Sequence, residues 1–231
     1  CGLEQNVEIV DAQPTAKCVI YQGKTQPKEE YSWDGFAWNG FENWNDLVTE
    51  ISDWNSFYSN FSEILLLGSD IEFDGYDEST KKCGEDYETV VLCGVSFDGQ
   101  GKTIRNFCQV REDVAAFFSG FTYATVENVT FENAHVELQV LKNESENTQF
   151  GAIVAANLET AKITKVQVVS SDLIINSPDN ANKAAYVGVL AANVSNSNIS
   201  DNTVKNSKIT GDGANSSEEG FSVGGLVGYF R

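Results

Sequence analysis

Short apolar segments separated by polar turn residues run from residue 63 to the end of the chain. Segments such as VGVLAA (187–192) and SKIT (207–210) are too short for helices. Their apolar and polar positions alternate with period two, which is typical of strands whose side chains point to opposite faces. Gly, Asn, Asp and Ser occupy the expected turns, and the whole chain has only 3 prolines. The pattern therefore predicts an all-β region over residues 63–231.

The first part of the chain, residues 1–62, has a different pattern. Residues 31–44 (YSWDGFAWNGFENW) space aromatic side chains with Gly and Asn, which predicts a tightly turned, aromatic-packed segment. Leu47, Ile51 and Trp54 then follow at helical spacing, so we expect a short amphipathic helix that caps the β region. We interpret the aromatic side chains as core, and carbohydrate binding is the alternative interpretation.

An internal repeat with a period of 36 residues organises the second half of the chain. One step places FGAIVAAN (150–157) on YVGVLAAN (186–193), and a second step places the latter on SVGGLVGY (222–229). A step of 37 residues in the other direction places Ile163 on Val126. A fixed period in this range is the signature of a solenoid, in which each repeat stacks on its neighbours.

Each repeat contains three short strand segments, which predicts a right-handed parallel β-helix with three strands per coil. Inward side chains such as Leu190, Ile199 and Val204 should stack on their counterparts in neighbouring coils. The predicted repeats are 114–149, 150–185 and 186–221, with a partial repeat at 222–231. Three polar segments, at 142–149, 177–185 and 212–220, fall at the same corner of successive coils and should be variable surface loops.

The repeat resembles the family named for its GLUG motif. GGLVGY (224–229) matches that motif closely, VGVLAAN (187–193) and GAIVAAN (151–157) are diverged versions, and AAFFSGF (115–121) is a distant one. The segments LLGSDIEFDG (66–75) and VSFDGQGKTIRNF (95–107) are similar to the lead-in of such repeats. The resemblance implies a β-helix in a secreted or surface protein, often adhesin-like, with no common catalytic residue.

The charge of the chain excludes some functions. It has 34 Asp and Glu against 15 Lys and Arg, a net charge of −19. A general nucleic-acid binder needs clustered Lys and Arg, so we expect no nucleic-acid partner, and adsorption to anionic lipid is disfavoured. No run of 18 apolar residues predicts a membrane span, so we expect no direct membrane insertion.

The cysteines indicate an oxidising compartment. Cys1, Cys18, Cys83, Cys93 and Cys108 form no CxxC pair and no Cys/His cluster, so disulfides are a better interpretation than zinc. The candidate pairs are Cys1–Cys18 and two of the other three. The fifth cysteine would be free, carry lipid or bond another chain. Cys1 followed by Gly2 fits a lipidated lipoprotein terminus, and fits equally a chain cut by signal peptidase.

The residues do not predict catalysis. His135 is the only histidine and falls at a repeat corner, where we expect a surface side chain. Parallel β-helices can cleave polysaccharides with paired acids, but Glu127, Asp172 and Asp201 fall at non-equivalent places of the repeat. We therefore expect no enzyme activity and no cofactor.

Two motifs imitate ligand sites. DGQGKT (98–103) resembles the end of a phosphate-binding P-loop, but Ser96 replaces the required first Gly, and a turn with glycines at positive φ is the better interpretation. DIEFDG (70–75) spaces Asp70, Glu72 and Asp74 two apart, which predicts a solvated acidic ridge on one face of a strand. Weak calcium binding there is the alternative hypothesis.

Candidate glycosylation sites follow from the N-x-[S/T] sequons. Asn143 and Asn215 lie in the predicted loops and rank first, followed by Asn60, Asn193 and Asn198. A sixth sequon, at Asn128 in VENV, is expected to overlay Asn106 in IRNF, and both asparagines should form hydrogen bonds along the stack at a corner.

The last predicted strand suggests an assembly edge. Leu226, Val227, Tyr229 and Phe230 begin a further coil whose outer neighbour is not part of the sequence, so we expect self-association or further repeats there. Taken together, these features predict an extracellular or surface structural or adhesive protein, and glycosylation and a role as a filament subunit are further hypotheses. A module that binds or cleaves carbohydrate, with surface glycans as its partners, is the alternative.

Overall fold

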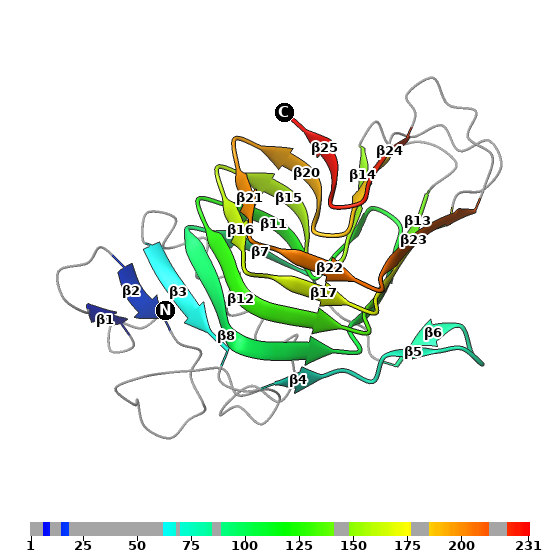
Figure 1. Cartoon of the computed structure of the whole chain (residues 1–231), viewed down its shortest axis with the longest axis horizontal. Coiled ribbons are helices and arrows are strands. Elements are labelled where there is room, and N and C mark those ends of the chain that lie inside the picture. The colour runs from blue at the N-terminus through cyan, green and yellow to red at the C-terminus, as the bar shows by residue number, and fades with distance from the viewer. Residues whose placement is uncertain are drawn as a thin grey trace.

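The computed structural model describes residues 7–9, 15–18, 62–67, 70–84, 89–140, 148–176, 185–212 and 221–231. Every regular element in these ranges is a β-strand, and most strands pair in parallel. From β7 onward the chain passes in turn through four stacks of strands, and each complete pass, called a coil here, adds a layer to every stack (Figure 1). The predicted all-β parallel solenoid is confirmed.

The strands of each stack follow one another in chain order. Stack 1 holds β7 (Val90–Cys93), β11 (Phe118–Thr122), β15 (Ala155–Glu159), β20 (Ala191–Ser195) and β25 (Val227–Phe230). Stack 2 holds β3 (Ser62–Leu66), β8 (Val95–Arg105), β12 (Thr125–Glu132), β16 (Lys162–Thr164), β17 (Gln167–Val169), β21 (Asn198–Ser200) and β22 (Thr203–Lys205). Stack 3 holds β9 (Cys108–Arg111), β13 (His135–Gln139), β18 (Asp172–Asn176) and β23 (Lys208–Asp212). Stack 4 holds β10 (Val114–Ala115), β14 (Gln149–Ala152), β19 (Ala185–Gly188) and β24 (Phe221–Gly224).

Further strands lie at the N-terminal side of the solenoid. β2 (Thr15–Cys18) pairs in parallel with β3, and β1 (Val7–Ile9) pairs with β2 in the antiparallel sense. β4 (Ile71–Glu72) pairs with the end of β8. β5 (Tyr76–Asp77) and β6 (Lys82–Cys83) form an antiparallel hairpin. The predicted capping helix at Leu47–Trp54 lies outside the described residues.

The register between coils confirms the 36-residue repeat. Ile163 pairs with Ile199 and Leu173 pairs with Ile209, and hydrogen bonds between these coils join residues 36 apart. The spacing is 37 between the preceding two coils at the corner of Ser171, and 27 between β8 and β12 at Arg105. The short spacing arises because β9 and β10 are joined by Glu112 and Asp113 alone, without a long loop.

The coil has four strand stacks where the sequence pattern predicted three strands. The segment VGVLAA does not form one strand, because the chain bends between β19 and β20 at Val189 and Leu190. Both side chains are buried, at 3 % and 0 % exposure, and two consecutive inward side chains interrupt the alternation of a straight strand. The expected count of three was therefore wrong.

Stacks 4 and 1 meet at this bend through small residues. Ala152 and Ala192 are fully buried in a cluster of alanines separate from the main core. In the last coil the same bend is made by β24 and β25, which form the two arms of a sharp turn (Figure 1). A Cβ on Gly224 would lie 1.7 Å from the carbonyl oxygen of Val227, and one on Gly228 would lie 2.5 Å from the backbone nitrogen of Val187. Gly224 and Gly228 of GGLVGY are therefore required by close backbone approach, whereas a Cβ on Gly225 would meet open space.

Most of the other turns in the coil contain a residue with the same unusual backbone conformation. A residue with positive φ stands at the turns between stacks 1 and 2, inside stack 2 and between stacks 2 and 3, for example Asn133 at 55°, Lys165 at 54° and Asn206 at 52°. The turn at DGQGKT follows the same rule in part, since Gly101 has φ 74° and Gln100 has φ 50°. Gly99 serves a different purpose, because its Cβ would lie 2.5 Å from the Cβ of Val129. DGQGKT is thus a turn within β8, as expected.

Candidate functional site

The acidic segment at residues 70–75 alternates as predicted. Asp70, Glu72 and Asp74 are exposed, whereas Ile71 and Phe73 between them are buried at 1 % and 5 % exposure. The three carboxylates therefore lie on the outer side of the chain and the apolar side chains enter the core.

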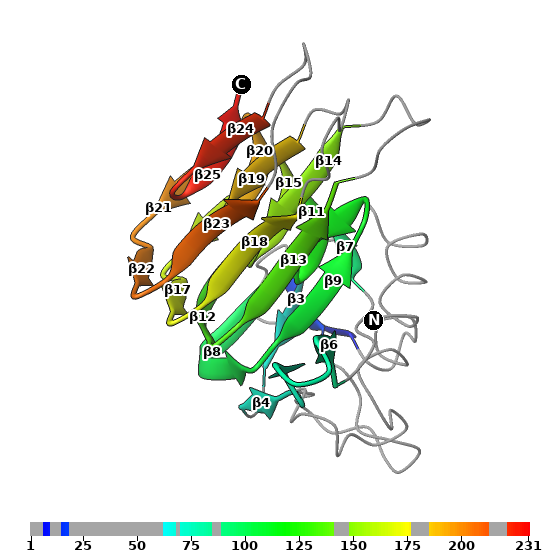
Figure 2. The same cartoon turned by 90° about the vertical axis from the view of Figure 1, so that its right-hand side faces the viewer.

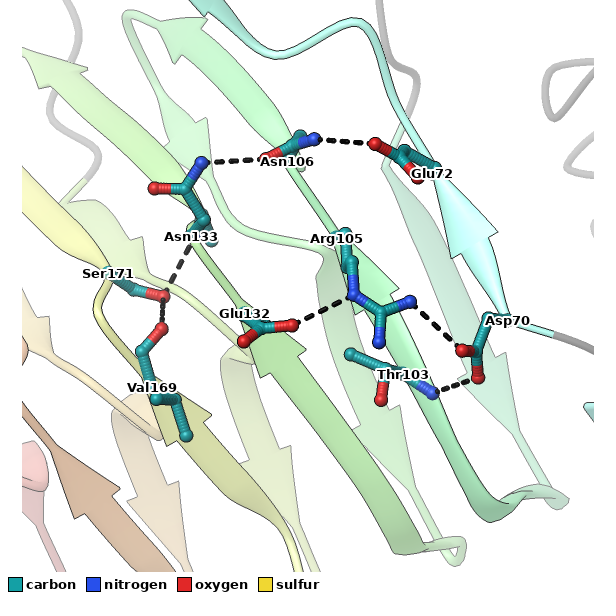
Figure 3. Close-up of polar contacts among 10 residues, drawn as sticks. Asp70, Glu72, Thr103, Arg105, Asn106, Glu132, Asn133, Val169 and Ser171 are labelled. Atoms are coloured by element: carbon teal, nitrogen blue, oxygen red, sulfur yellow. Dashed lines mark hydrogen bonds and ion pairs between the residues drawn. The ribbon is translucent and has the colours of Figure 1, made fainter.

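Arg105 on β8 joins this segment to the next coil (Figure 3). Its Nη1 donates to Asp70 Oδ2 at 2.9 Å, and its Nε donates to Glu132 Oε2 at 2.8 Å. Asp70 Oδ1 also accepts the backbone N–H of Thr103 at 2.9 Å. The Thr103 hydrogen bond and then Arg105 hold the pKa of Asp70 below its ordinary value. The side chains are 37–48 % exposed, so solvent screens these ion pairs and their main effect is to fix geometry.

These contacts bear on the calcium hypothesis. Both carboxylate oxygens of Asp70 accept hydrogen bonds from the protein, so a cation bound there would have to displace Arg105. Within the described ranges, no group of three or more His, Cys, Asp or Glu side chains could hold a metal ion. The arrangement gives Asp70 a structural role at the junction of three strands.

The two corner asparagines form hydrogen bonds along the stack, but they do not overlay. Asn106 Nδ2 donates to Glu72 at 3.2 Å, and Asn128 Nδ2 donates to Asp98 at 3.1 Å. The residue over Asn106 is Asn133, whose Nδ2 donates to Asn106 Oδ1 at 2.6 Å (Figure 3). The expected overlay was wrong because the register of β8 and β12 shifts at the turn inside β8.

Serine side chains tie neighbouring coils at the corner before stack 3. Ser171 Oγ accepts the backbone N–H of Ala134 at 3.0 Å and donates to the carbonyl of Val169 at 2.9 Å (Figure 3). Ser207 repeats this arrangement one coil later and accepts the N–H of Ser171 at 3.1 Å. These hydrogen bonds satisfy backbone donors that the turns leave unpaired.

His135 is half-buried, in contrast to the expected surface side chain. The ring of Tyr76, from the hairpin, stacks on its imidazole with centroids 3.7 Å apart and planes 10° apart. Nε2 of His135 is buried and has no hydrogen-bond partner among the described residues. Burial lowers the pKa of His135, although the nearby carboxylates of Glu137 and Asp172 act in the opposite direction.

His135 belongs to a row of ionisable or sulfur-containing side chains on the outer face of stack 3. Its Cα partners are Cys108 in the preceding coil and Asp172 in the following coil, and Lys208 continues the row. Lys208 Nζ lies 3.3 Å from Asp172 Oδ2. Figure 2 shows the strands that carry this row, β9, β13, β18 and β23, side by side with β6 next to the first of them.

The hairpin is held to this row by a disulfide. Cys83, at the end of β6, is bonded to Cys108, and their Cα atoms are 5.5 Å apart. The sequence left open which two of Cys83, Cys93 and Cys108 would pair, and the structure identifies them. Cys1 lies outside the described residues, and Cys18 and Cys93 are described only as members of β2 and β7.

The carboxylates considered for catalysis do not share a row. Glu127 pairs with Asp98 and Thr164, Asp172 pairs with His135, and Asp201 stands at a corner with φ 58°. An acid pair for glycoside hydrolysis needs two carboxyl groups that face one substrate, and these three residues lie on different parts of the coil.

A recess of about 650 Å³ opens at the first corner between stacks 3 and 4. It lies where Glu112 and Asp113 form the whole connection and where later coils have longer connections. The recess combines one guanidinium, two carboxylates, an amide and a hydroxyl with two apolar side chains; its lining residues are Thr89, Val110, Arg111, Glu112, Asp113, Val114 and Gln139.

The candidate glycosylation sites divide into two groups. Asn60, Asn143 and Asn215 lie outside the described residues. Asn193 is half-buried in β20, and its Nδ2 donates to Asn157 Oδ1 at 3.1 Å. Asn198, at the start of β21, is exposed.

The predicted assembly edge is exposed and apolar. Phe230 pairs with Val194, which is fully buried, but Phe230 itself is 65 % exposed. Leu226 lies one coil after the fully buried Leu190 and is 51 % exposed. These side chains take interior positions of the coil, and no later strand among the described residues covers them.

Sequence reasoning missed Arg105 and Tyr76. Arg105 contacts Glu132 of the next coil, and Tyr76 on the hairpin contacts His135 of the solenoid, so neither partner lies nearby in the chain. A signal existed for Arg105, the one basic side chain of IRNF (104–107), which follows strand periodicity next to an acidic strand. No signal in the sequence indicated that Tyr76 would lie on His135.

No family model matches the chain, and no curated protein matches it. Among solved structures, the chain is similar to a Bacteroides ovatus protein whose crystal structure is described as that of a "putative immunoglobulin A1 protease". The two share 17 % sequence identity, and the match covers 79 % of this chain and 71 % of that chain with a TM-score of 0.36. This likeness is distant and carries no argument about activity.

Proposed function

We propose that the chain is a non-catalytic structural or adhesive solenoid that acts outside the cytoplasm. It serves as a rigid support for the polar segments that connect stack 3 to stack 4 in successive coils. The right-handed winding and membership of the GLUG-type repeats are part of this proposal.

The main support for the proposal is the position of the long connections between strands. Residues 140–148, 177–184 and 213–220 each connect a strand of stack 3 to a strand of stack 4. The connections elsewhere in the described coils are only one or two residues long. Variation in length and composition is thus confined to one corner, which is typical of a scaffold that presents binding loops.

The interior supports a rigid scaffold. Its core side chains, from Phe97 to Val194, are almost all less than 5 % exposed, and polar side chains such as Ser171 and Ser207 tie the coils together. Candidate acids do not converge, and Asp70 and Glu132 are bound by Arg105.

The disulfide supports a location in an oxidising compartment. No helix in the described part of the chain is long and apolar enough to cross a membrane. Lipid anchoring through Cys1 and glycan at the loop asparagines are further parts of the proposal.

Assembly through the apolar edge is the remaining part. Leu226, Tyr229 and Phe230 would be covered by a strand from a second copy or from further repeats. The change Phe230→Asp should shift any multimer seen by light scattering toward the monomer, with Tyr123→Asp, at an exposed corner, as the matched control.

A loop exchange tests the display function. Residues 177–184 and 213–220 are replaced by Gly/Ser segments of equal length, and the variant is compared with the unchanged chain on a glycan array and on immobilised extracellular-matrix proteins. We expect an unchanged far-ultraviolet circular dichroism spectrum and melting temperature, together with loss of any binding. Unchanged binding in the loop variant would contradict display by these loops.

A second measurement tests the absence of catalysis. The chain is incubated with a panel of plant, bacterial and animal polysaccharides, and released reducing ends are measured. We expect none above the level of a heat-denatured control, and turnover of any polymer would overturn the proposal.

The recess favours carbohydrate binding as a second candidate function. Its mixture of donors and acceptors suits hydroxyl groups, which both donate and accept hydrogen bonds, and its volume is in the range of ligand sites. Titration with oligosaccharides, followed by NMR shifts at Gln139 and Val110, tests this function. A glycan whose binding is lost in Gln139→Ala but retained in the loop variant would favour the recess over display.

A further inference from the structure

We propose that Cys83–Cys108 is an exchangeable disulfide, cleaved and re-formed by thiols, and that His135 assists by stabilising Cys108 as the leaving group. This site lies on stack 3, away from the corner that carries the loops, and does not depend on the proposed display function. The reductant is a low-molecular-weight thiol of the surroundings.

The two cysteines differ in exposure to solvent. Cys108 is 4 % exposed, whereas Cys83 at the end of the hairpin is only partly buried. An attacking thiolate reaches the sulfur that faces solvent, so Cys83 is attacked and Cys108 is released. Residues 78–81 of the hairpin turn are exposed, and the half-buried Cys83 follows them two residues later.

The released sulfur has a suitable neighbour. Cys108 and His135 are Cα partners in adjacent parallel strands, so their side chains share one face at the strand spacing of about 4.8 Å. Nε2 of His135 is buried without a hydrogen-bond partner in the described chain. Asp172, the next member of the row, is placed to orient the imidazole and to stabilise its protonated form. The order thiol, imidazole, carboxylate is the arrangement that activates cysteine in proteins.

The charges around His135 come from each element packed against it. Glu137 lies on its own strand, Asp172 and Lys208 on the two following strands, and Glu78 on the hairpin with Tyr76. The three carboxylates favour the imidazolium, while burial and Lys208 oppose it. A thiolate formed at Cys108 would add a fourth negative charge beside the ring, so bond cleavage itself promotes protonation of His135.

The exchange balances as follows. A thiolate RS⁻ attacks Sγ of Cys83, an R–S–Sγ bond forms, and the Sγ–Sγ bond breaks with its electron pair on Cys108, beside His135. A second RS⁻ attacks the outer sulfur of the mixed disulfide, which releases RSSR and leaves Cys83 as a thiolate that takes a proton from water. Two thiolates are oxidised to one disulfide, and the protein disulfide is reduced to the Cys83 thiol and the Cys108 thiolate, whose charge is balanced by protonated His135.

Cleavage would change the surface of stack 3. The hairpin β5–β6 is fixed to the solenoid by the disulfide and by the Tyr76–His135 stack, and Tyr76 and Cys83 are themselves Cα partners. The disulfide and the Tyr76 ring that covers His135 are therefore attached to paired residues of the same hairpin. Once reduced, the hairpin can leave and uncover Cys108, His135 and Asp172.

The test measures reduction of the folded protein by 2-mercaptoethanol at several pH values, with each cysteine followed by alkylation and mass spectrometry. We expect Cys83 to carry the mixed disulfide and Cys108 to be alkylated first. The rate constant, corrected to the concentration of attacking thiolate, should rise as pH falls through the titration of His135. In His135→Gln it should be about tenfold lower and independent of pH, because the leaving thiolate loses its partner.

Two further measurements separate chemistry from folding. Asp172→Asn should weaken the pH dependence without abolishing it, and Glu159→Gln, an exposed change on stack 1, should leave the rate unchanged. In the reduced unchanged chain, the alkylation profile of Cys108 should give a thiol pKa below the ordinary value of about 8.5. Reduction that occurs only on global unfolding, or an ordinary thiol pKa together with equal rates in His135→Gln, would overturn the proposal.

Discussion

The front coils, residues 89–140, and the rear coils, residues 185–231, fill the same kind of interior in different ways. The front interior is aromatic and fully buried, with Phe97, Phe107, Phe117, Phe118, Phe121 and Phe131 at 1 % exposure or less. The rear interior is aliphatic, and Ile199, Val204 and Ile209 are only partly buried. The front coils also carry the disulfide and lack the long loop between stacks 3 and 4.

The difference shows two ways of stabilising a solenoid. The rear coils repeat similar side chains regularly, whereas the front coils pack aromatic rings closely. In the rear coils each row repeats a similar side chain every 36 residues, so neighbouring layers contribute similar amounts. In the front coils, the rings pack edge to face at centroid distances of 4.8–5.1 Å around Phe117, and each position is unique. We expect the front to tolerate substitution less well than the rear.

The largest expected effect comes from the aromatic cluster. Phe117→Ala removes a fully buried ring that contacts four other phenylalanines and should lower the free energy of unfolding by about 3–5 kcal/mol. Urea denaturation followed by circular dichroism measures this change. The control Tyr123→Ala, at a 67 % exposed corner of the same coil, should change stability by less than about 0.5 kcal/mol. Similar losses in both variants would contradict an aromatic front core.

A matched pair of valines compares the middle coil, residues 148–176, with the rear coil directly. Val168 is fully buried, and Val204, its Cα partner one coil later, is partly buried. Val168→Ala should cost about 2 kcal/mol and Val204→Ala about half as much, because less apolar surface leaves water at the outer coil. Equal costs would mean that the rear coil is covered in solution, for example by a second copy, and the experiment should then be repeated at high dilution.

The serine contacts give a smaller effect of the same sign. Ser171→Ala leaves the buried N–H of Ala134 without its acceptor and should cost about 1–2 kcal/mol. Ser207→Ala removes the equivalent hydrogen bond near the surface and should cost about 0.5–1 kcal/mol. Thermal unfolding of both variants under identical conditions measures the difference, and the reverse order would show that the rear coil depends more on its polar contacts.

The smallest expected effect is a pH dependence confined to the front coils. Burial lowers the pKa of His135, so the unfolded chain binds a proton at a higher pH than the folded chain. Stability is therefore fully present above the ordinary histidine pKa of about 6.5 and falls as pH decreases below it. His135→Gln should remove this part of the pH profile. The loss due to Asp70, whose pKa is lowered, should remain and occur at more acidic pH.

The solenoid could be predicted because similar side chains recur at a fixed period and contact one another across coils. Leu173 and Ile209, or Val168 and Val204, occupy the same row, so one apolar pattern specifies both strand spacing and register. The corners were harder to predict. The bend at Val189 and Leu190 depends on two inward side chains and on the close approach of glycine and alanine backbones, which a period-two pattern does not reveal.

The candidate sites were less predictable than the fold. The sequence limited the disulfide to two of three cysteines, but the choice of Cys83 and Cys108 depends on where the hairpin lies. His135 was expected at the surface because its polar neighbours in the chain suggested a turn, whereas Tyr76 covers it from a separate element. The acidic segment was predicted correctly as outward-facing, but its partner Arg105 comes from another coil.

The sequence by itself indicated the strands of the described part of the β region, the 36-residue period and the inward and outward faces, because each depends on local alternation or on repetition. Only the tertiary structure decided that each coil has four stacks and that Cys108, His135 and Asp172 form a row. It also decided that Tyr76 and Cys83 of the hairpin contact this row on stack 3. The physical reason is that in a solenoid the neighbours of a side chain are one coil away, about 27–37 residues along the chain. Which side chains from different coils come together is therefore determined by the strand register and by the position of the hairpin.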